Sequence, residues 1–160
     1  MLGVFRQLRN EGTKDETETA FWGAVGGRIN VGGGKDNLRF EINGGDGIGR
    51  YASLALSPDA VLRADGTLSA VSSVQGFVAY QHWWTPTVRS NLVYGIADID
   101  QETGLADTEE ETVQSVHLNL MWSPQKNVRY GIEYLYGKRE LFNGDEGELN
   151  RLQFSGRYVF

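Results

Sequence analysis

A set of arginines and two glutamates gives this 160-residue sequence its clearest chemical character. Each falls on the polar side of a segment in which polar and apolar residues alternate, and together these candidates are Arg28, Arg39, Glu41, Arg89, Arg129, Glu133, Arg139, Arg151 and Arg157. On neighbouring strands of a channel wall, such arginines would form a positive ladder that attracts small anions and carboxylates. The alternative is that they pair with the two glutamates and with loop acids, and only solvate the wall.

Other constellations for catalysis or metal binding are weak. Glu41 and Glu133 suit a carboxylate pair for hydrolysis, but carboxylates on a polar wall need no catalytic role. We place His82 at an interface beside two tryptophans and His117 on the polar side, and neither has a Ser or Cys partner at a recognisable spacing. The acidic stretch 98–111 lacks the spacing of a calcium loop and is typical of a solvated loop, although it could bridge lipopolysaccharide through divalent ions. We therefore expect no enzyme activity, no cofactor and no metal site.

The candidates are positioned by alternating segments, of which the last, Leu152–Phe160, is the clearest. Apolar or aromatic residues at 152, 154, 158 and 160 alternate with polar ones, which is the period of a strand with two different faces. The same period recurs over 19–31, 38–43, 70–84, 88–97, 115–123 and 128–139, with a less regular first strand over 1–10. About eight antiparallel strands follow from these segments.

The connections alternate in length. Those at 32–37, 85–87 and 124–127 are short, whereas the breaks at 11–17, 44–66, 98–111 and 142–147 are longer or more charged. Inside the longest break, Ser57-Pro58-Asp59 predicts a helix start followed by one or two turns over 60–64. Short turns on one side and longer loops on the other are typical of outer-membrane barrels, whose short turns are periplasmic. The last residue, Phe160, then lies at the periplasmic rim.

Aromatic side chains gather at that predicted rim, where amphipathic rings suit the head-group depth of a membrane. The predicted membrane-interface aromatics are Trp83, Trp84, Trp122, Tyr158 and Phe160. Composition agrees with a barrel: Gly is 21 and Pro only 3, there is no Cys, and the mean hydropathy of −0.38 leaves no apolar window of helical length. The net charge of −6 disfavours a nucleic-acid partner.

A family resemblance joins these observations. The segments Phe77–Pro86, Arg89–Gly95, Gly45–Tyr51 and Asn150–Ser155 are similar to those of DcaP-type trimeric porins of Gram-negative bacteria. The resemblance implies an antiparallel up-and-down transmembrane β-barrel in the cell outer membrane, whose family members are longer and have roughly sixteen strands. Residues 1–160 would then be one porin domain, the C-terminal half of such a barrel, with Met1 an internal start.

The resemblance also implies a function and partners. The expected function is passive diffusion of small hydrophilic solutes, with anions or carboxylates favoured if the arginine ladder forms. The alternatives are a complete eight-stranded outer-membrane barrel with a structural or adhesion role, and a soluble ligand-binding β-barrel. Expected partners are outer-membrane lipid and lipopolysaccharide, two further copies in a homotrimer, and the barrel-assembly machinery, because a terminal Phe160 with Tyr158 before it resembles a barrel insertion signal.

Overall fold

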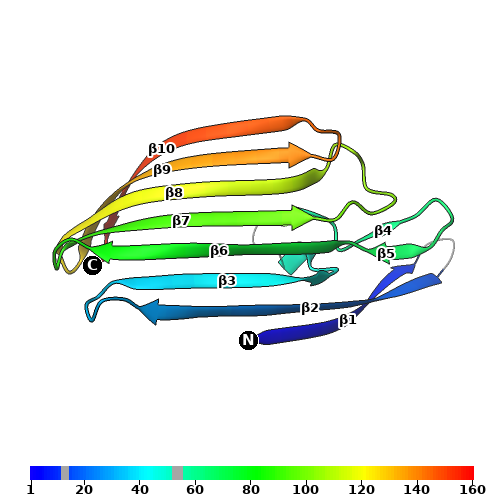
Figure 1. Cartoon of the computed structure of the whole chain (residues 1–160), viewed down its shortest axis with the longest axis horizontal. Helices are drawn as coiled ribbons and strands as arrows, with labels where there is room; N and C mark the ends of the chain where they lie inside the picture. Colours follow the sequence, from blue (N-terminus) through cyan, green and yellow to red (C-terminus); the bar gives the residue numbers. More distant parts are fainter. Residues whose placement is uncertain (12–14, 52–55) are drawn as a thin grey trace.

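The structure is a computed structural model that describes residues 1–11, 15–51 and 56–160. Eight long strands form one sheet in the order β1-β2-β3-β6-β7-β8-β9-β10, and all neighbours are antiparallel (Figure 1). The strands are β1 (Leu2–Glu11), β2 (Asp15–Asn30), β3 (Asn37–Asp46), β6 (Ser72–Trp83), β7 (Val88–Ile99), β8 (Glu110–Gln125), β9 (Val128–Leu141) and β10 (Glu146–Tyr158). In the described part of the chain, no helix has the length and apolar character needed to cross a membrane.

The turns after β2, β6 and β8 lie at the end of the sheet that also carries the C-terminus, here called the turn end (Figure 1). The opposite, or loop, end carries the connection between β3 and β6 and the one between β7 and β8. The prediction of longer loops at this end is confirmed for these two connections, whereas the β1–β2 and β9–β10 connections at the same end are no longer than the turns. Two loops are shorter than expected, since β2 already begins at Asp15 and β10 at Glu146. Charged side chains there belong to strands that continue beyond the apolar part of the sheet.

The sheet is apolar on its outer face, and the apolar band runs at a slant to the strands. One row of paired residues shows this: Glu148, Lys138 and Gln114 on β10, β9 and β8 continue into Ile96, Gly76, Ile42 and Val25 on β7, β6, β3 and β2. An apolar band that lies parallel to the membrane gives this pattern when the strands are tilted, because each strand then crosses the edge of the band at a different residue. Barrel strands in membranes tilt by about 35–45°.

The long connection after β3 folds back over the hollow face of β1 and β2. It contains a 3₁₀ turn, η1 (Gly49–Tyr51), and a two-stranded hairpin of β4 (Ala60–Leu62) and β5 (Leu68–Ala70). The helix expected over 60–64 is therefore wrong. A small core lies beneath the connection, where Ile48 and Val71 are buried together with Ala20 and Trp22 of β2.

This cover explains why the alternation of the first strand is weak. Leu8 of β1 faces the connection, close to Gly47, and Val4 and Arg6 share its half-buried face, so both faces of β1 contain apolar residues. The sheet itself is open. β1 and β10 lie at its two edges, and neither pairs with a strand on its outer side among the described residues. This geometry disfavours the alternative of a closed eight-stranded barrel.

Gly45 is the position where the backbones of β2 and β3 approach too closely for a side chain. Its φ is +137°, and a Cβ there would meet the carbonyl oxygen of Phe21 at 2.3 Å. We expect Gly45→Ala to destabilise the sheet by about 2 kcal/mol, because the backbone of β2 would have to move to make room for the methyl group. Urea unfolding in detergent micelles, followed by tryptophan fluorescence, measures the change. Gly34→Ala is the control, since a Cβ there meets nothing within 4 Å; equal midpoints for the two variants would contradict the clash.

Candidate pore-lining face

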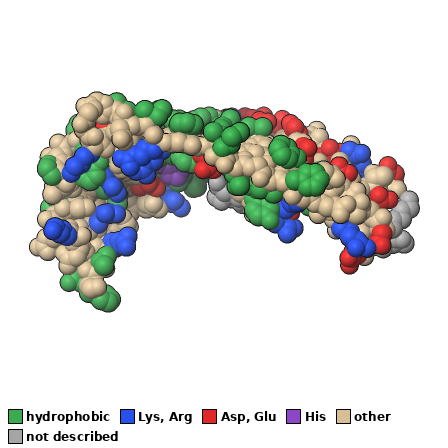
Figure 2. Space-filling view, turned by 90° about the horizontal axis from the view of Figure 1, so that it is seen from below, with side chains coloured by type: hydrophobic (Ala, Val, Ile, Leu, Met, Phe, Trp, Pro, Cys, Tyr) green, Lys and Arg blue, Asp and Glu red, His purple; other side chains and the backbone are tan. Residues whose placement is uncertain are grey.

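The nine predicted pore-lining residues all lie on the hollow face of the sheet, opposite to the apolar band. By the strand register, their side chains lie on the same face of the sheet as those of Ala20 and Trp22, which the long connection covers. Figure 2 shows Lys and Arg side chains gathered on the hollow side of the arch, mainly toward the turn end. The alternation of polar and apolar residues in the sequence therefore assigned each of these residues to the polar face of its strand, as the structure has it.

The strand register places arginines directly opposite one another. Arg28 on β2 pairs with Arg39 on β3, and Arg129 on β9 pairs with Arg157 on β10. Cβ atoms of such directly opposed residues lie about 4.5–5.5 Å apart, and like charges at this distance repel. A sequence alone cannot reveal these pairs, because they depend on which residues of two strands face each other.

These four arginines have no carboxylate partner within the described ranges. Arg39 donates to Asn37 Oδ1 at 2.9 Å, and Arg129 to Ser123 Oγ at 3.5 Å. Of the nine candidates, Arg139 alone has a recorded ion pair with a carboxylate in those ranges, at 3.5 Å from Glu110. The alternative in which Glu41 and Glu133 neutralise the arginines is therefore not what the geometry shows.

The two glutamates are instead held by neutral and imidazole groups. Asn43 donates to Glu41 Oε1 at 3.3 Å. Glu133 accepts from Asn119 at 3.2 Å and from Gln153 at 2.9 Å, and His117 Nδ1 lies 3.5 Å from it. The hollow face consequently combines unneutralised arginines with carboxylates that are tied into amide contacts.

Four of the five predicted interface aromatics project outward at the turn end. Trp84, Trp122, Tyr158 and Phe160 are all exposed, and Tyr158 lies 6.2 Å from Phe160 between ring centroids. Trp83 is the exception. It lies on the hollow face between two cations, with Lys35 Nζ 5.1 Å and the Arg89 guanidinium 5.5 Å from its ring, an arrangement stabilised by cation–π attraction. The face on which Trp83 lies is set by its place in the alternation along β6, and not by its nearness to the turn.

Asp36 in the turn between β2 and β3 was not singled out from the sequence. Its carboxylate accepts the backbone N–H of Trp83 at 2.8 Å, and its other oxygen lies 2.6 Å from His82 Nδ1 and 3.1 Å from the Tyr80 hydroxyl. The Trp83 N–H and the His82 ring lower the pKa of the Asp36 carboxyl. This acid ties the turn to β6, and His82 stands edge-on to Trp84 as expected for an interface residue.

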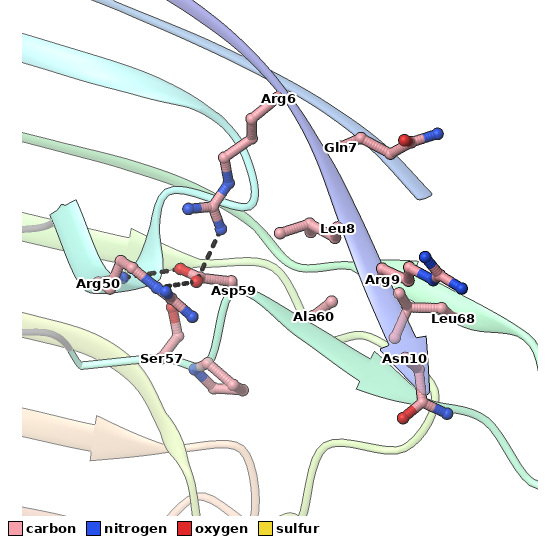
Figure 3. Close-up of a pocket in the computed structure, with 11 residues that line it drawn as sticks. Arg6, Gln7, Leu8, Arg9, Asn10, Arg50, Ser57, Asp59, Ala60 and Leu68 are labelled. Atoms are coloured by element: carbon pink, nitrogen blue, oxygen red, sulfur yellow. Dashed lines mark hydrogen bonds and ion pairs between the residues drawn. The ribbon is translucent and has the colours of Figure 1, made fainter. Parts of the chain in front are cut away.

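Asp59 anchors the long connection to β1 (Figure 3). Its carboxylate binds Arg6 of β1 at 2.7 Å, accepts the backbone N–H of Arg50 at 2.8 Å, and also receives the Arg50 side chain. Burial raises the pKa of Asp59, but the hydrogen bonds and charges of Arg50 and Arg6 outweigh it and the net shift is downward. The groove around this anchor has a volume of about 610 Å³.

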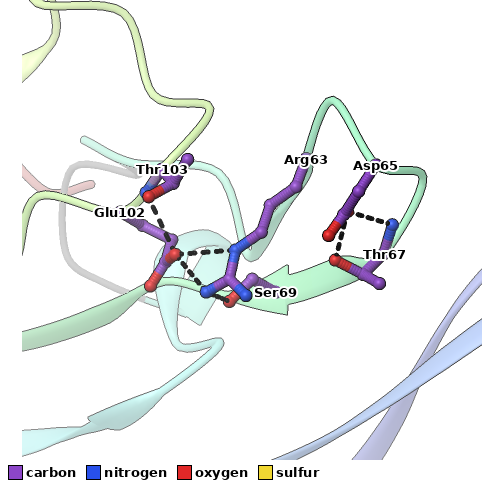
Figure 4. Close-up of polar contacts among 6 residues, drawn as sticks. All are labelled: Arg63, Asp65, Thr67, Ser69, Glu102 and Thr103. Carbon is purple, nitrogen blue, oxygen red and sulfur yellow. Dashed lines mark hydrogen bonds and ion pairs between the residues drawn. The ribbon is translucent and has the colours of Figure 1, made fainter.

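A second ion pair joins the two large loops (Figure 4). Arg63, between β4 and β5, donates to Glu102 Oε1 from Nη2 at 2.5 Å and from Nε at 3.1 Å. The same guanidinium donates to Ser69 Oγ, and Glu102 also accepts the backbone N–H of Thr103. The hydrogen bond from Arg63 lowers the pKa of Glu102.

An open sheet of tilted strands, apolar outside and polar on its hollow side, with aromatic residues at the turn end, is the wall of a β-barrel of the bacterial outer membrane. The family model described as DcaP outer membrane protein matches residues 2–160. The chain belongs to that family, and its location is the outer membrane.

The fold also matches a solved structure, the crystal structure of the outer membrane channel DcaP of Acinetobacter baumannii. The TM-score is 0.89 at 23% sequence identity, over 99% of this chain. The chain corresponds to 45% of that channel chain, less than half of its length. No curated protein matches the sequence.

The Arg63–Glu102 pair makes the contact between the loops sensitive to acid. Because the folded pKa of Glu102 is lowered, the pair stabilises the loop contact above the ordinary glutamate pKa of about 4.3 and is lost as pH falls below it. Spin labels at Thr67 and Ala106 would report this as a broadening of their distance distribution between pH 6 and pH 3. In Glu102→Gln the distribution should change little over this range; an identical acid response in both proteins would assign it to other groups.

Proposed function

We propose that this chain forms part of the wall of a passive diffusion channel for small hydrophilic solutes, with anions favoured over cations. The observation that carries the proposal is the set of arginines on the hollow face, two pairs of which oppose each other without a recorded carboxylate partner in the described ranges. In a water-filled lumen such charges raise the local concentration of anions and lower that of cations.

The channel needs no chemical step, and we propose no enzymatic role. Solutes move down their gradients, and the wall contributes only its shape and its charges. Arg89 extends the positive field beyond the two pairs, since it lies on the same hollow face of β7 and pairs with Trp83 across to β6. Carboxylates are the favoured anions because a planar guanidinium can bind one through two parallel hydrogen bonds.

A closed lumen requires further strands that pair with β1 and β10. The match to less than half of a solved channel chain supports a barrel of about twice this number of strands. We further propose that the assembled barrel is a homotrimer, as the sequence resemblance implies, and that its outer band contacts lipid and its loop end lipopolysaccharide.

Ion selectivity tests the proposal directly. In planar bilayers with a KCl gradient, the reversal potential of the reconstituted protein should indicate preference for chloride. Arg129→Gln combined with Arg157→Gln should lower the chloride-to-potassium permeability ratio about sixteenfold, since each charge contributes about 0.4 kcal/mol at roughly 10 Å in water and acts with opposite sign on the two ions.

The matched control is Arg9→Gln combined with Lys126→Gln, which removes the same charge from an exposed strand end, where Arg9 is paired with Asp15, and from the exposed turn between β8 and β9. This control should leave the ratio unchanged. Cation selectivity of the unmodified protein, or equal ratios for both double variants, would overturn the anionic preference.

The last strand provides a separate prediction about assembly. Phe160 and Tyr158 are exposed at the C-terminal end of β10, where the barrel-assembly machinery could bind their aromatic side chains. Deletion of Phe160 should reduce the amount of folded protein in the outer membrane severalfold, as measured by heat-dependent gel mobility of membrane fractions. Val159→Ala, on the other face of the same terminus, should assemble normally; normal assembly without Phe160 would contradict the proposed recognition.

A further inference from the structure

A row of five amide side chains and one carboxylate crosses six strands on the hollow face, and from Asn37 to Asn119 each amide donates a hydrogen bond to the next residue of the row. Asn37 donates to Gln81 at 3.1 Å, Gln81 to Asn91 at 2.9 Å, Asn91 to Asn119 at 2.7 Å, and Asn119 to Glu133 at 3.2 Å. Gln153 on β10 reaches Glu133 from the other side at 2.9 Å. We call the row Asn37–Gln81–Asn91–Asn119–Glu133–Gln153 the amide track.

The two ends of the run from Asn37 to Glu133 fix the direction of its hydrogen bonds. Arg39, which can only donate, binds Asn37 Oδ1 at 2.9 Å, while the Glu133 carboxylate at the other end receives the N–H of Asn119. Every amide between them must therefore present its oxygen toward Arg39 and its nitrogen toward Glu133. Aligned bonds of this kind polarise one another and hold the side chains in place.

The middle of the track retains hydrogen-bonding capacity on its hollow side. An amide nitrogen carries two N–H groups and its oxygen two lone pairs, but Gln81 and Asn91 each use one N–H and one oxygen contact among the recorded bonds of the described residues. Asn37 is fully buried, whereas the middle residues are half-buried. Neutral donors and acceptors thus stand next to each other along the wall, one strand spacing of about 4.8 Å apart.

The track also crosses the wall obliquely. It follows one row of paired residues, and such rows slant relative to the apolar band. It starts at Asn37, beside the turn end. It finishes at Gln153, next to Leu152, which is the outward apolar residue of β10 nearest the loop end. Five strand spacings at a tilt of about 40° give a rise of about 15 Å, more than half of the ~25 Å apolar band.

We propose that the amide track is a binding path for neutral polyhydroxylated solutes, meaning sugars and polyols, separate from the arginines that act on anions. Hydroxyl groups both donate and accept, so they can replace the water on one track residue after another without an uncompensated loss of hydrogen bonds. Charge plays no part in this recognition, because the side chains at its centre are neutral amides. The proposal rests on the channel function proposed above.

Solute flux into proteoliposomes tests the track. The probes are mannitol, which donates and accepts hydrogen bonds, and a poly(ethylene glycol) dimethyl ether of similar size, which only accepts. Asn91→Leu combined with Asn119→Leu conserves side-chain volume but removes the central amides. We expect the mannitol-to-ether flux ratio to fall about fivefold, corresponding to one net hydrogen bond of about 1 kcal/mol, and single-channel conductance in KCl shows whether the variant forms an open channel.

Asn43→Leu is the matched control, because Asn43 lies on the same hollow face but contacts Glu41 instead of the track. It should leave the flux ratio unaltered. If the double variant does not assemble, Gln81→Met provides the same test with one amide removed. An unchanged ratio in an assembled, conducting track variant overturns the track alone, whereas absence of conductance in the unmodified protein overturns both the track and the channel.

Discussion

The requirement that backbone polar groups be paired within a membrane governs this structure. Lipid offers no hydrogen bonds, so a sheet can span it only when every strand has two neighbours. The six strands from β2 to β9 meet that condition inside the sheet, whereas β1 and β10 each leave one edge unpaired among the described residues. Such edges invite pairing with other strands. Within a membrane both edges therefore need strands to pair with, and under the proposed channel function the hollow face borders a lumen once those strands are present.

The same requirement explains the difference between the two faces. Side chains facing lipid can be apolar throughout, since the backbone is already satisfied by its neighbours. On the hollow face, the long connection buries Ile48 and Val71 against β2. Elsewhere its polar side chains must satisfy one another sideways across the strands, as Asn91 and Asn119 do. The local core and the lateral hydrogen bonds are two solutions to one problem, applied to different parts of one surface.

Strands and faces could be predicted from the sequence because the two-residue period is local information. The errors come from signals that other contacts override. Ser57-Pro58-Asp59 has the chemistry of a helix start, but the Asp59 carboxylate is taken by Arg6 and Arg50, and a hairpin follows. The charged stretches after Glu11 and before Glu148 suggested loops, yet charged side chains are compatible with strands that extend past the membrane. The opposition of Arg129 and Arg157 needs the register, which no local pattern contains.

The neutrality of the amide track has a consequence for the arginines near it. Had the positions of Gln81, Asn91 and Asn119 carried carboxylates, those groups would have formed ion pairs with neighbouring guanidinium groups and cancelled their field. Amides keep the wall hydrated and ordered without adding charge. The single carboxylate in the row, Glu133, is occupied by Asn119 and Gln153, with His117 nearby. A polar wall can therefore remain positive although the whole chain carries a net charge of −6, because its acids are concentrated elsewhere, in the loops and strand ends of the loop end.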